Sequence, residues 1–301
     1  MAKFSMKHLR YFEALARHGH FRKAAEDCAI TQPALSMQIR ELEGIVGAPL
    51  VERSARQVRL TALGEDFAER ARGILRAVDE LDDLVRSTTV SMVGKLRLGI
   101  IPTIAPYLLP QVIQALSAKF PGIDLRPRET VTKTLIEDLI ECRIDMAILA
   151  LPISEPSLRE IELFREEFVL VRPLQDSDKP IPNSEKLREM RLLLLEEGHC
   201  FRDQALSFCS IGDEAPSEMM EGSSLTTLVQ MVGTGIGVTL IPEMAVPIET
   251  RSSSVSVAQL AEPRPSRTVG LVWRKSSPLE KQFMQVAEVV KEAGLRRLQA
   301  S

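Results

Sequence analysis

The chain has 301 residues, enough for two or three domains, and its hydrophobic fraction of 45% and charged fraction of 26% are ordinary for a globular protein. It lacks an apolar run long enough to cross a bilayer and a signal-peptide segment, so we expect a cytoplasmic protein with no membrane partner. Four cysteines are too few for a disulfide scaffold, and no cysteine and histidine residues have zinc-site spacing. We expect neither a metal nor a cofactor.

Charge is distributed unevenly along the chain. Residues 1–60 contain ten Lys and Arg but only six Asp and Glu, whereas the whole chain has a net charge of −3. A small basic head on an acidic body is typical of a DNA-binding domain joined to a separate regulatory domain. The excess is modest, so this indication is weak by itself.

The head has the pattern of three short helices. Apolar residues recur at helical spacing in the first helix, which Gly19 ends, at Leu9, Phe12, Leu15 and Ala16. A second helix is predicted over 21–27, and a turn over 28–30. Thr31 is placed to cap a third helix that has Pro33 in its first turn.

The third helix carries polar side chains opposite its apolar stripe of Leu35, Ile39 and Leu42. Hydrogen-bonding groups at the front of such a helix can contact base edges and phosphates in a major groove. Residues 47–61 then predict a two-stranded wing whose arginines can bind phosphates. The expected DNA-binding residues are Arg22, Thr31, Gln32, Pro33, Ser36, Gln38, Arg40, Arg53, Arg56 and Arg59.

A long helix is predicted over 61–89. Its apolar residues alternate in steps of four and three, at Phe67, Ala71, Ile74, Val78, Leu81 and Val85. This heptad spacing favours a dimerising helix, since a helix that packs only on its own domain keeps a broader apolar stripe. A dimer would present two recognition helices to two half-sites at a fixed spacing.

Strands and helices alternate through the rest of the chain, which predicts an α/β fold with parallel sheet. The predicted strands cover 95–101, 124–129, 145–149, 167–171, 192–195, 238–240 and 268–274. We expect two lobes joined by two crossovers, near 164–168 and 265–268. The predicted domains are a DNA-binding domain (1–62), a linker helix (63–92), a first effector subdomain (93–166 and 268–301) and a second (167–267).

Two cysteines enclose a predicted helix. Cys200 would occupy its first turn, where free backbone N–H groups favour a thiolate. Nine residues of helix rise roughly 13 Å, whereas a disulfide needs Cα atoms within about 7 Å. Cys200 and Cys209 could therefore pair only if the helix came apart. The alternative, which spacing alone favours, is that both pack as small inert hydrophobes.

Polar residues follow several predicted strands, at 101–106, 130–132 and 198–200, and Arg267 lies at the second crossover. Ligands of open α/β sheets bind beside the carboxyl ends of strands, so we expect a site between the lobes.

Several motifs in the head follow in a defined order: Phe21-Arg22-Lys23-Ala24-Ala25, Thr31-Gln32-Pro33-Ala34-Leu35-Ser36, Leu50 with Glu52-Arg53, and Leu60-Thr61 with Gly64. Their order and spacing resemble the winged helix-turn-helix of LysR-type transcriptional regulators. Two departures are Thr31 in place of the usual Ser, and Val51 in place of the usual Phe. The resemblance implies a DNA-binding regulator, not an enzyme, whose bilobed effector domain is similar to periplasmic solute-binding proteins.

Motifs in the body narrow this resemblance: Gly198-His199-Cys200-Phe201-Arg202-Asp203-Gln204-Ala205 with Phe208-Cys209, Ile101-Pro102-Thr103-Ile104-Ala105-Pro106, and Arg267-Thr268-Val269-Gly270-Leu271-Val272-Trp273-Arg274. Together they are similar to the OxyR peroxide sensors within the LysR type. The resemblance implies that hydrogen peroxide oxidises Cys200 to a sulfenic acid, which Cys209 converts to a disulfide. It assigns the peroxide pocket to Thr103, Thr132, His199 and Arg267, with Asp203 beside them.

The resemblance also implies partners. They are double-stranded promoter DNA at antioxidant genes, RNA polymerase, hydrogen peroxide as the signal, a thioredoxin- or glutaredoxin-type reductant, and further copies of the chain in a dimer of dimers.

Two other functions stay open: a LysR-type regulator that binds a small organic ligand between the lobes, with inert cysteines, and a thiol peroxidase. For single residues, the alternative role of Thr103 and Thr132 is to cap helices. The alternative for Arg267 is a surface ion pair, and the alternative for His199 is a solvated position in a loop. The alternative for Asp203 is an ion pair with Arg202.

Overall fold

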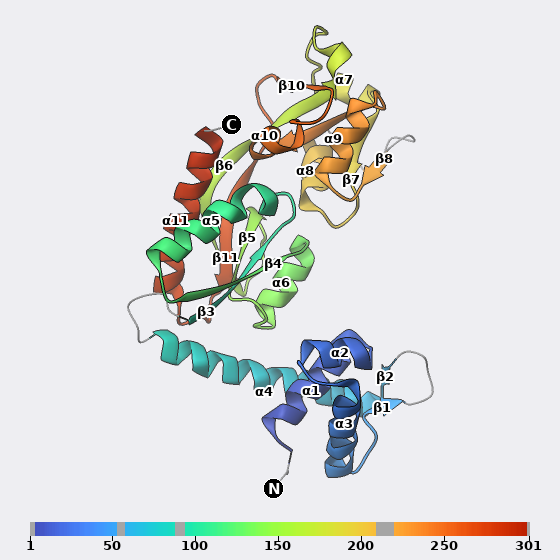
Figure 1. Ribbon diagram of the computed structural model, residues 1–301, viewed down its shortest axis with the longest axis vertical. Coiled ribbons are helices and arrows are strands. Elements are labelled where there is room, and N and C mark those ends of the chain that lie inside the picture. Colours follow the sequence, from blue (N-terminus) through green and yellow to red (C-terminus); the bar gives the residue numbers. More distant parts are fainter. Residues whose placement is uncertain (1–3, 53–57, 88–93, 209–219, 300–301) are drawn as a thin grey trace. The chain divides into compact units, whose positions relative to one another are not determined.

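The computed structural model describes residues 4–52, 58–87, 94–208 and 220–299. The chain divides into two compact units, Met1–Val85 and Arg86–Ser301, which are drawn in Figure 1. Three of the predicted site residues, Arg53, Arg56 and Cys209, lie outside the described residues. The predicted limits of the linker and of the two effector subdomains stay predictions.

The first unit is a winged helix-turn-helix, as predicted. Its elements are α1 (Met6–His18), α2 (Phe21–Asp27), α3 (Gln32–Val46), β1 (Val51–Glu52), β2 (Arg59–Leu60) and α4 (Ala62–Ser87). Gly19 ends α1 in the left-handed conformation at φ 60°, which glycine adopts without steric cost. The Thr31 side chain accepts a hydrogen bond from Ala34 N and caps α3. Phe12, Leu15, Leu35 and Leu42 are completely buried between the helices.

Helix α4 has two parts that differ in their packing. Near its start, Phe67 makes edge-to-face contacts with the rings of Phe4 and Phe12 at centroid distances of 5.8 and 5.4 Å, so this end belongs to the core of the unit. Further along, Leu81 is 62% exposed and Val85 is 70% exposed. The heptad positions therefore change from core contacts to an uncovered apolar stripe as the helix proceeds.

The second unit is built on one mixed sheet of nine strands. In sheet order these are β4 (Ile123–Glu129), β3 (Gly94–Ile100), β5 (Met146–Leu151), β11 (Ser266–Arg274), β6 (Leu158–Pro173), β9 (Val238–Pro242), β7 (Leu192–Leu195) and β8 (Met220–Gly222), with β10 (Val255–Gln259) also paired to β6. Strand β3 is parallel to β4 and β5, and β7 is parallel to β8 and β9.

The prediction of a parallel sheet was wrong at the centre. Strand β6 has 16 residues and runs antiparallel to β11, so one long pair connects the two lobes (Figure 1). The predicted strand at 167–171 is only the later part of β6, because charged residues interrupt the apolar pattern of its first half. Gly270 lies at an irregularity in the β6–β11 register, and a Cβ there would come within 2.7 Å of the Ile161 carbonyl oxygen.

Helices cover the sheet, and two short 3-10 turns, η1 (Leu174–Asp176) and η2 (Glu243–Ala245), follow strands. The helices are α5 (Ala105–Lys119), α6 (Thr132–Ile140), α7 (Ser184–Glu189), α8 (Cys200–Phe208), α9 (Leu225–Gly233), α10 (Val246–Glu249) and α11 (Glu280–Gln299). Helices α5 and α11 lie side by side (Figure 1). None of the described helices is both long enough and apolar enough to cross a membrane.

Candidate functional site

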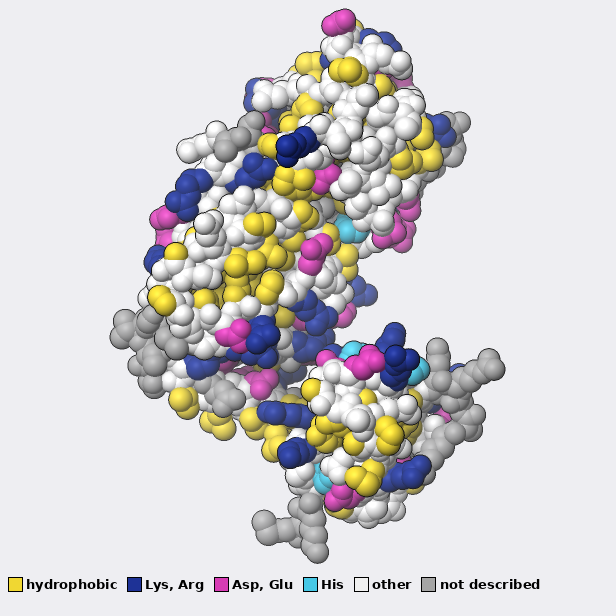
Figure 2. Space-filling model, viewed as in Figure 1, with side chains coloured by type: hydrophobic (Ala, Val, Ile, Leu, Met, Phe, Trp, Pro, Cys, Tyr) yellow, Lys and Arg dark blue, Asp and Glu magenta, His cyan; other side chains and the backbone are white. Residues whose placement is uncertain are grey.

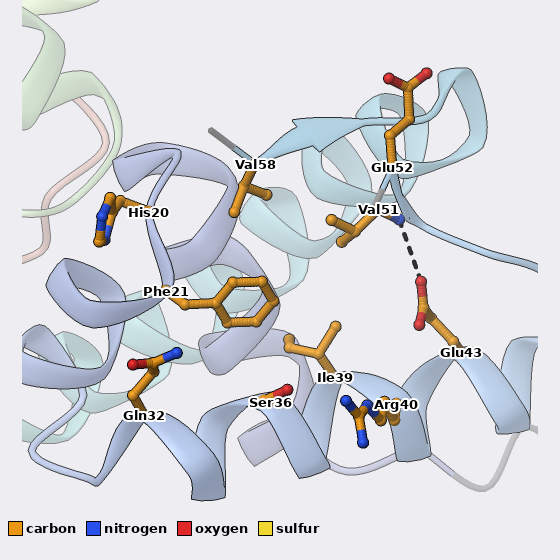
Figure 3. Close-up of a pocket in the computed structure, with 10 residues that line it drawn as sticks. All are labelled: His20, Phe21, Gln32, Ser36, Ile39, Arg40, Glu43, Val51, Glu52 and Val58. Carbon is orange, nitrogen blue, oxygen red and sulfur yellow. Dashed lines mark hydrogen bonds between the residues drawn. The ribbon is translucent and has the colours of Figure 1, made fainter. Parts of the chain in front are cut away.

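The front of helix α3 and the wing enclose a pocket of about 340 Å³ in the first unit. Gln32, Ser36 and Arg40 line this space from successive turns of α3, and Phe21 and Val58 line it from the side of α2 and the wing (Figure 3). Their spacing along one helix puts these three polar heads on one face. This face has the hydrogen-bonding groups that contact with a DNA groove requires.

His20 lies at the same pocket, although it was not among the predicted residues (Figure 3). Its Nδ1 accepts a hydrogen bond from Arg22 N at 3.1 Å and caps α2. Because Nδ1 is the acceptor, the remaining ring nitrogen is available as a donor toward a phosphate. The sequence feature that could have identified this residue is its position immediately before the predicted helix over 21–27, where a side chain can cap the helix.

The other predicted DNA-binding residues have different surroundings. Gln38 donates to Glu41 within α3 at 2.9 Å, and Arg22 donates to Glu26 within α2 at 3.0 Å; both pairs are exposed. Thr31 and Pro33 shape the first turn of α3. Arg59 is exposed on β2 of the wing.

Glu43 fixes the start of the wing to the recognition helix. Its side chain is nearly buried, and Oε1 accepts hydrogen bonds from Leu50 N at 2.9 Å and Val51 N at 3.2 Å; the second is drawn in Figure 3. Charge-assisted bonds to backbone N–H groups are among the stronger hydrogen bonds. Glu43 therefore determines where β1 lies relative to α3, a role that its sequence position did not indicate.

In the second unit, Arg267 is buried at the start of β11 and is not a surface ion pair. Its Nε donates to Glu166 Oε2 at 2.8 Å, and Nη2 lies 2.7 Å from the same oxygen. Its Nη1 donates to the Thr103 hydroxyl at 2.8 Å, and Nη2 to the Thr103 carbonyl at 2.9 Å. Glu166 is held in turn by Met244 N, which donates to Oε1 at 3.0 Å. We call Thr103, Glu166 and Arg267 the arginine cluster.

Helix α8 touches this cluster through the residue after Cys200. Phe201 is buried, its ring lies 5.8 Å below the Arg267 guanidinium, and it packs edge-to-face on Phe168 at 4.8 Å. Cys200 itself is half-buried with a free thiol and occupies the first turn of α8, as the sequence predicted. His199 precedes it and is nearly buried, so it is not a solvated loop residue.

The remaining predicted pocket residues are less closely connected. Thr132 begins α6, and its buried hydroxyl has no hydrogen-bond partner among the described residues. Asp203 is exposed on α8. It does not pair with Arg202, which donates instead to the Leu195 carbonyl at 2.9 Å and to Glu221 at 2.6 Å. Within the described part of the chain, hydrogen bonds join only Thr103 and Arg267 of the five predicted peroxide-binding residues.

A second buried contact lies near the arginine cluster. The Tyr107 hydroxyl on α5 donates to Glu249 Oε1 on α10 at 2.7 Å, which joins the two lobes. Burial, and then the hydrogen bond to the Glu249 carboxylate, raise the pKa of Tyr107 well above its usual range. Neither residue was predicted, because a hydroxyl and a carboxylate 142 positions apart give no local signal.

Two other cysteines are less suited to thiolate chemistry. Burial, and secondarily the charge of Asp27, raise the pKa of the Cys28 thiol. Cys142 is buried, with 1% of its surface exposed. Across residues 4–52, 58–87, 94–208 and 220–299, no three His, Cys, Asp or Glu side chains are grouped to hold a metal ion.

Comparison with known proteins places this architecture in a family. Residues 6–65 match the bacterial regulatory helix-turn-helix protein of the lysR family, and residues 91–294 match the LysR substrate binding domain. The chain therefore belongs to the LysR family of DNA-binding regulators and is not an enzyme.

Its relatives include peroxide-responsive regulators. The probable hydrogen peroxide-inducible genes activator of Streptomyces viridosporus is 40% identical over 96% of this chain and 94% of that protein. A cysteine mutant of Corynebacterium glutamicum OxyR with hydrogen peroxide bound has a TM-score of 0.67 at 34% identity, covering 98% of this chain and 94% of the other. A full-length cysteine mutant of OxyR from Pseudomonas aeruginosa has a TM-score of 0.72 at 34% identity, covering 97% and 96%.

Proposed function

We propose that this chain is a hydrogen peroxide sensor that regulates transcription of antioxidant genes through a reversible disulfide between Cys200 and Cys209. The observation that supports it most directly is the half-buried Cys200 thiol in the first turn of α8, beside the residue on which the buried Arg267 rests. The similarity to proteins named for hydrogen peroxide supports the same signal.

The chemistry has two balanced steps. The Cys200 thiolate attacks one peroxide oxygen, the O–O bond breaks, and hydroxide leaves, so that sulfur is oxidised to a sulfenic acid. The Cys209 thiol then attacks this sulfur, forming the disulfide and releasing water. Arg267 supplies positive charge for the thiolate and the leaving oxygen, and the Thr103 and Thr132 hydroxyls orient peroxide together with His199. Asp203 is exposed on α8 and is the residue of this set that the structure supports least as part of the pocket.

Disulfide formation requires helix α8 to unwind. The helix runs over Cys200–Phe208, and its nine residues span roughly 13 Å when intact, well beyond the reach of a disulfide. Unwinding removes Phe201 from its buried place against Phe168 and Arg267. Loss of this anchor repacks the second lobe and so transmits oxidation to the rest of the regulator.

The partners follow from the two units. The first unit binds promoter DNA through Arg22, Thr31, Gln32, Pro33, Ser36, Gln38, Arg40, Arg53, Arg56 and Arg59. The uncovered stripe of α4 around Leu81 and Val85 pairs with a second copy, and two dimers form a tetramer. The regulator acts in the cytoplasm, recruits RNA polymerase, and is reset by a thioredoxin- or glutaredoxin-type reductant.

The test is to treat reduced full-length protein with near-stoichiometric hydrogen peroxide and map its thiols by non-reducing peptide mass spectrometry. We expect a Cys200–Cys209 disulfide that a dithiol reductant reverses, and no change of DNA footprint with peroxide in Cys200→Ser. If both thiols stay free while a small organic ligand changes the footprint, the chain is a ligand-responsive regulator instead. Rapid multiple turnover of peroxide with thioredoxin would identify a thiol peroxidase.

A further inference from the structure

A second pocket, separate from the arginine cluster and the cysteines, lies where the chain after β6 folds back over the sheet through η1 and α7. It has a volume of about 240 Å³. We propose that it binds a small organic anion, a carboxylate carried on an aromatic or similarly apolar body. This input would be distinct from peroxide.

The lining of this pocket carries more positive than negative charge. Three cationic side chains, Arg172, Lys179 and Lys186, face the pocket together with one carboxylate, Asp176. Asp176 is already paired with Lys179 at 2.7 Å. Two positive charges therefore remain for a ligand. Figure 2 shows basic and hydrophobic side chains next to each other at the α7 end of this unit.

Arg172 is buried in this lining, with only 7% of its surface exposed. Its guanidinium donates to the Ser256 hydroxyl at 3.1 Å, the Lys179 carbonyl at 2.7 Å and the Ser177 carbonyl at 2.6 Å. These acceptors are all uncharged, and among the described residues no carboxylate pairs with Arg172. Burial of a charge without a counter-charge is costly, so an anion bound here would be stabilised strongly.

The geometry of the side chain suits a carboxylate. A guanidinium has five N–H groups, of which the three bonds named above use three. The remaining N–H groups can bind a carboxylate, for which the planar fork of arginine is preorganised. Lys186 is exposed at the pocket mouth and supplies a second charge.

The walls select an apolar body rather than a bare inorganic ion. Leu170, Ile181 and Met190 line the pocket together with two prolines. Ile181 is 48% exposed, so part of this apolar wall is open to solvent. Apolar walls with a few convergent polar groups are the general form of a small-molecule site.

The test uses full-length Cys200→Ser protein, so that its outcome does not depend on the redox switch. Isothermal titration calorimetry with 1-naphthoate as probe is expected to give saturable binding with a Kd on the order of 1 mM or tighter, a range set by ordinary ligand efficiency. The uncharged 1-naphthamide is expected to bind at least tenfold more weakly.

Variants locate the site. Arg172→Gln is expected to weaken naphthoate binding at least tenfold, and Lys186→Gln about threefold. Lys186 keeps the proposal testable if Arg172→Gln disturbs the covering segment, since its side chain is exposed. Lys281→Gln, an equal charge change on α11, is the matched control and should leave binding unchanged. Absence of saturable binding, equal binding of the amide, or equal effects of Lys186→Gln and Lys281→Gln would overturn the proposal.

Discussion

Two buried arginines of the second unit differ in how their positive charge is compensated. Arg267 is 2% exposed and lies against a carboxylate, Glu166, whereas Arg172 is 7% exposed and bonds only to hydroxyl and carbonyl oxygens. Both are anchored on the long central strands, Arg172 on β6 and Arg267 on β11.

The difference shows that a buried positive charge can either be neutralised within the protein or be left without a counter-charge. The ion pair of Arg267 with Glu166 is complete without a ligand. Arg172 lacks this compensation, which makes it the better candidate for binding a free anion. Its uncharged acceptors satisfy hydrogen bonds but do not neutralise the charge.

The largest effect is expected from Arg267→Gln. The substitution leaves the Glu166 carboxylate buried without its cation, so the free energy of unfolding should fall by about 3–5 kcal/mol. Urea denaturation of the reduced protein measures it. A fall no larger than that caused by substituting an exposed residue would mean that Glu166 finds another partner and that its pairing with Arg267 contributes little to stability.

A somewhat smaller effect is expected from Glu166→Gln, about 2–3 kcal/mol by the same measurement, because the amide oxygen still accepts a bond while the charge is lost. The rate of Cys200 oxidation by peroxide should fall as well, since Arg267 is no longer held. Glu167→Gln is the adjacent control. It removes a half-exposed pair with Arg264, and its stability and oxidation rate should stay close to those of the unchanged protein.

Arg172→Gln should cost less than either, about 1–2 kcal/mol, because it breaks hydrogen bonds to neutral groups and leaves no buried charge behind. Thermal denaturation with and without 1-naphthoate separates the two roles of this residue. The probe should raise the Tm of the unchanged protein only. A loss as large as that of Arg267→Gln would show a hidden counter-charge.

The smallest effect is expected from Tyr107→Phe, about 1 kcal/mol at neutral pH from loss of one hydrogen bond to Glu249. Its pH dependence is more informative. The pKa of Tyr107 is raised in the folded protein, so its contribution is complete below the unfolded value of about 10 and is lost as pH rises above it. Stability curves of the two proteins should therefore converge in alkaline solution, and parallel curves would contradict the assignment.

Local signals were sufficient for the head. Helices α1 to α3 follow from apolar spacing, from Gly19 at a helix end and from Thr31 at a helix start. Each depends on residues within a few positions of one another, so no distant contact was needed. The heptad in α4 was detected for the same reason, but its division into a packed and an uncovered half was not, because Phe67 meets Phe4 and Phe12 from a remote part of the chain.

The sheet and the site depended on distant contacts. The long antiparallel pair of β6 and β11 joins strands separated by nearly one hundred residues, and charged residues conceal the first half of β6. The residues Thr103, Arg267 and Cys200 were found through motifs. Glu166, which pairs with Arg267, was not, because its acidic side chain resembles many on the surface.

The sequence by itself determined the class of protein, the recognition helix and the two candidate redox cysteines, since these depend on local pattern and motif spacing. Only the tertiary structure decided which charges are buried and what faces them. A carboxylate beside Arg267 and bare carbonyls beside Arg172 come from segments that the fold brings together. The energy of a charge depends on its burial and its partners, and neither is encoded next to it in the chain.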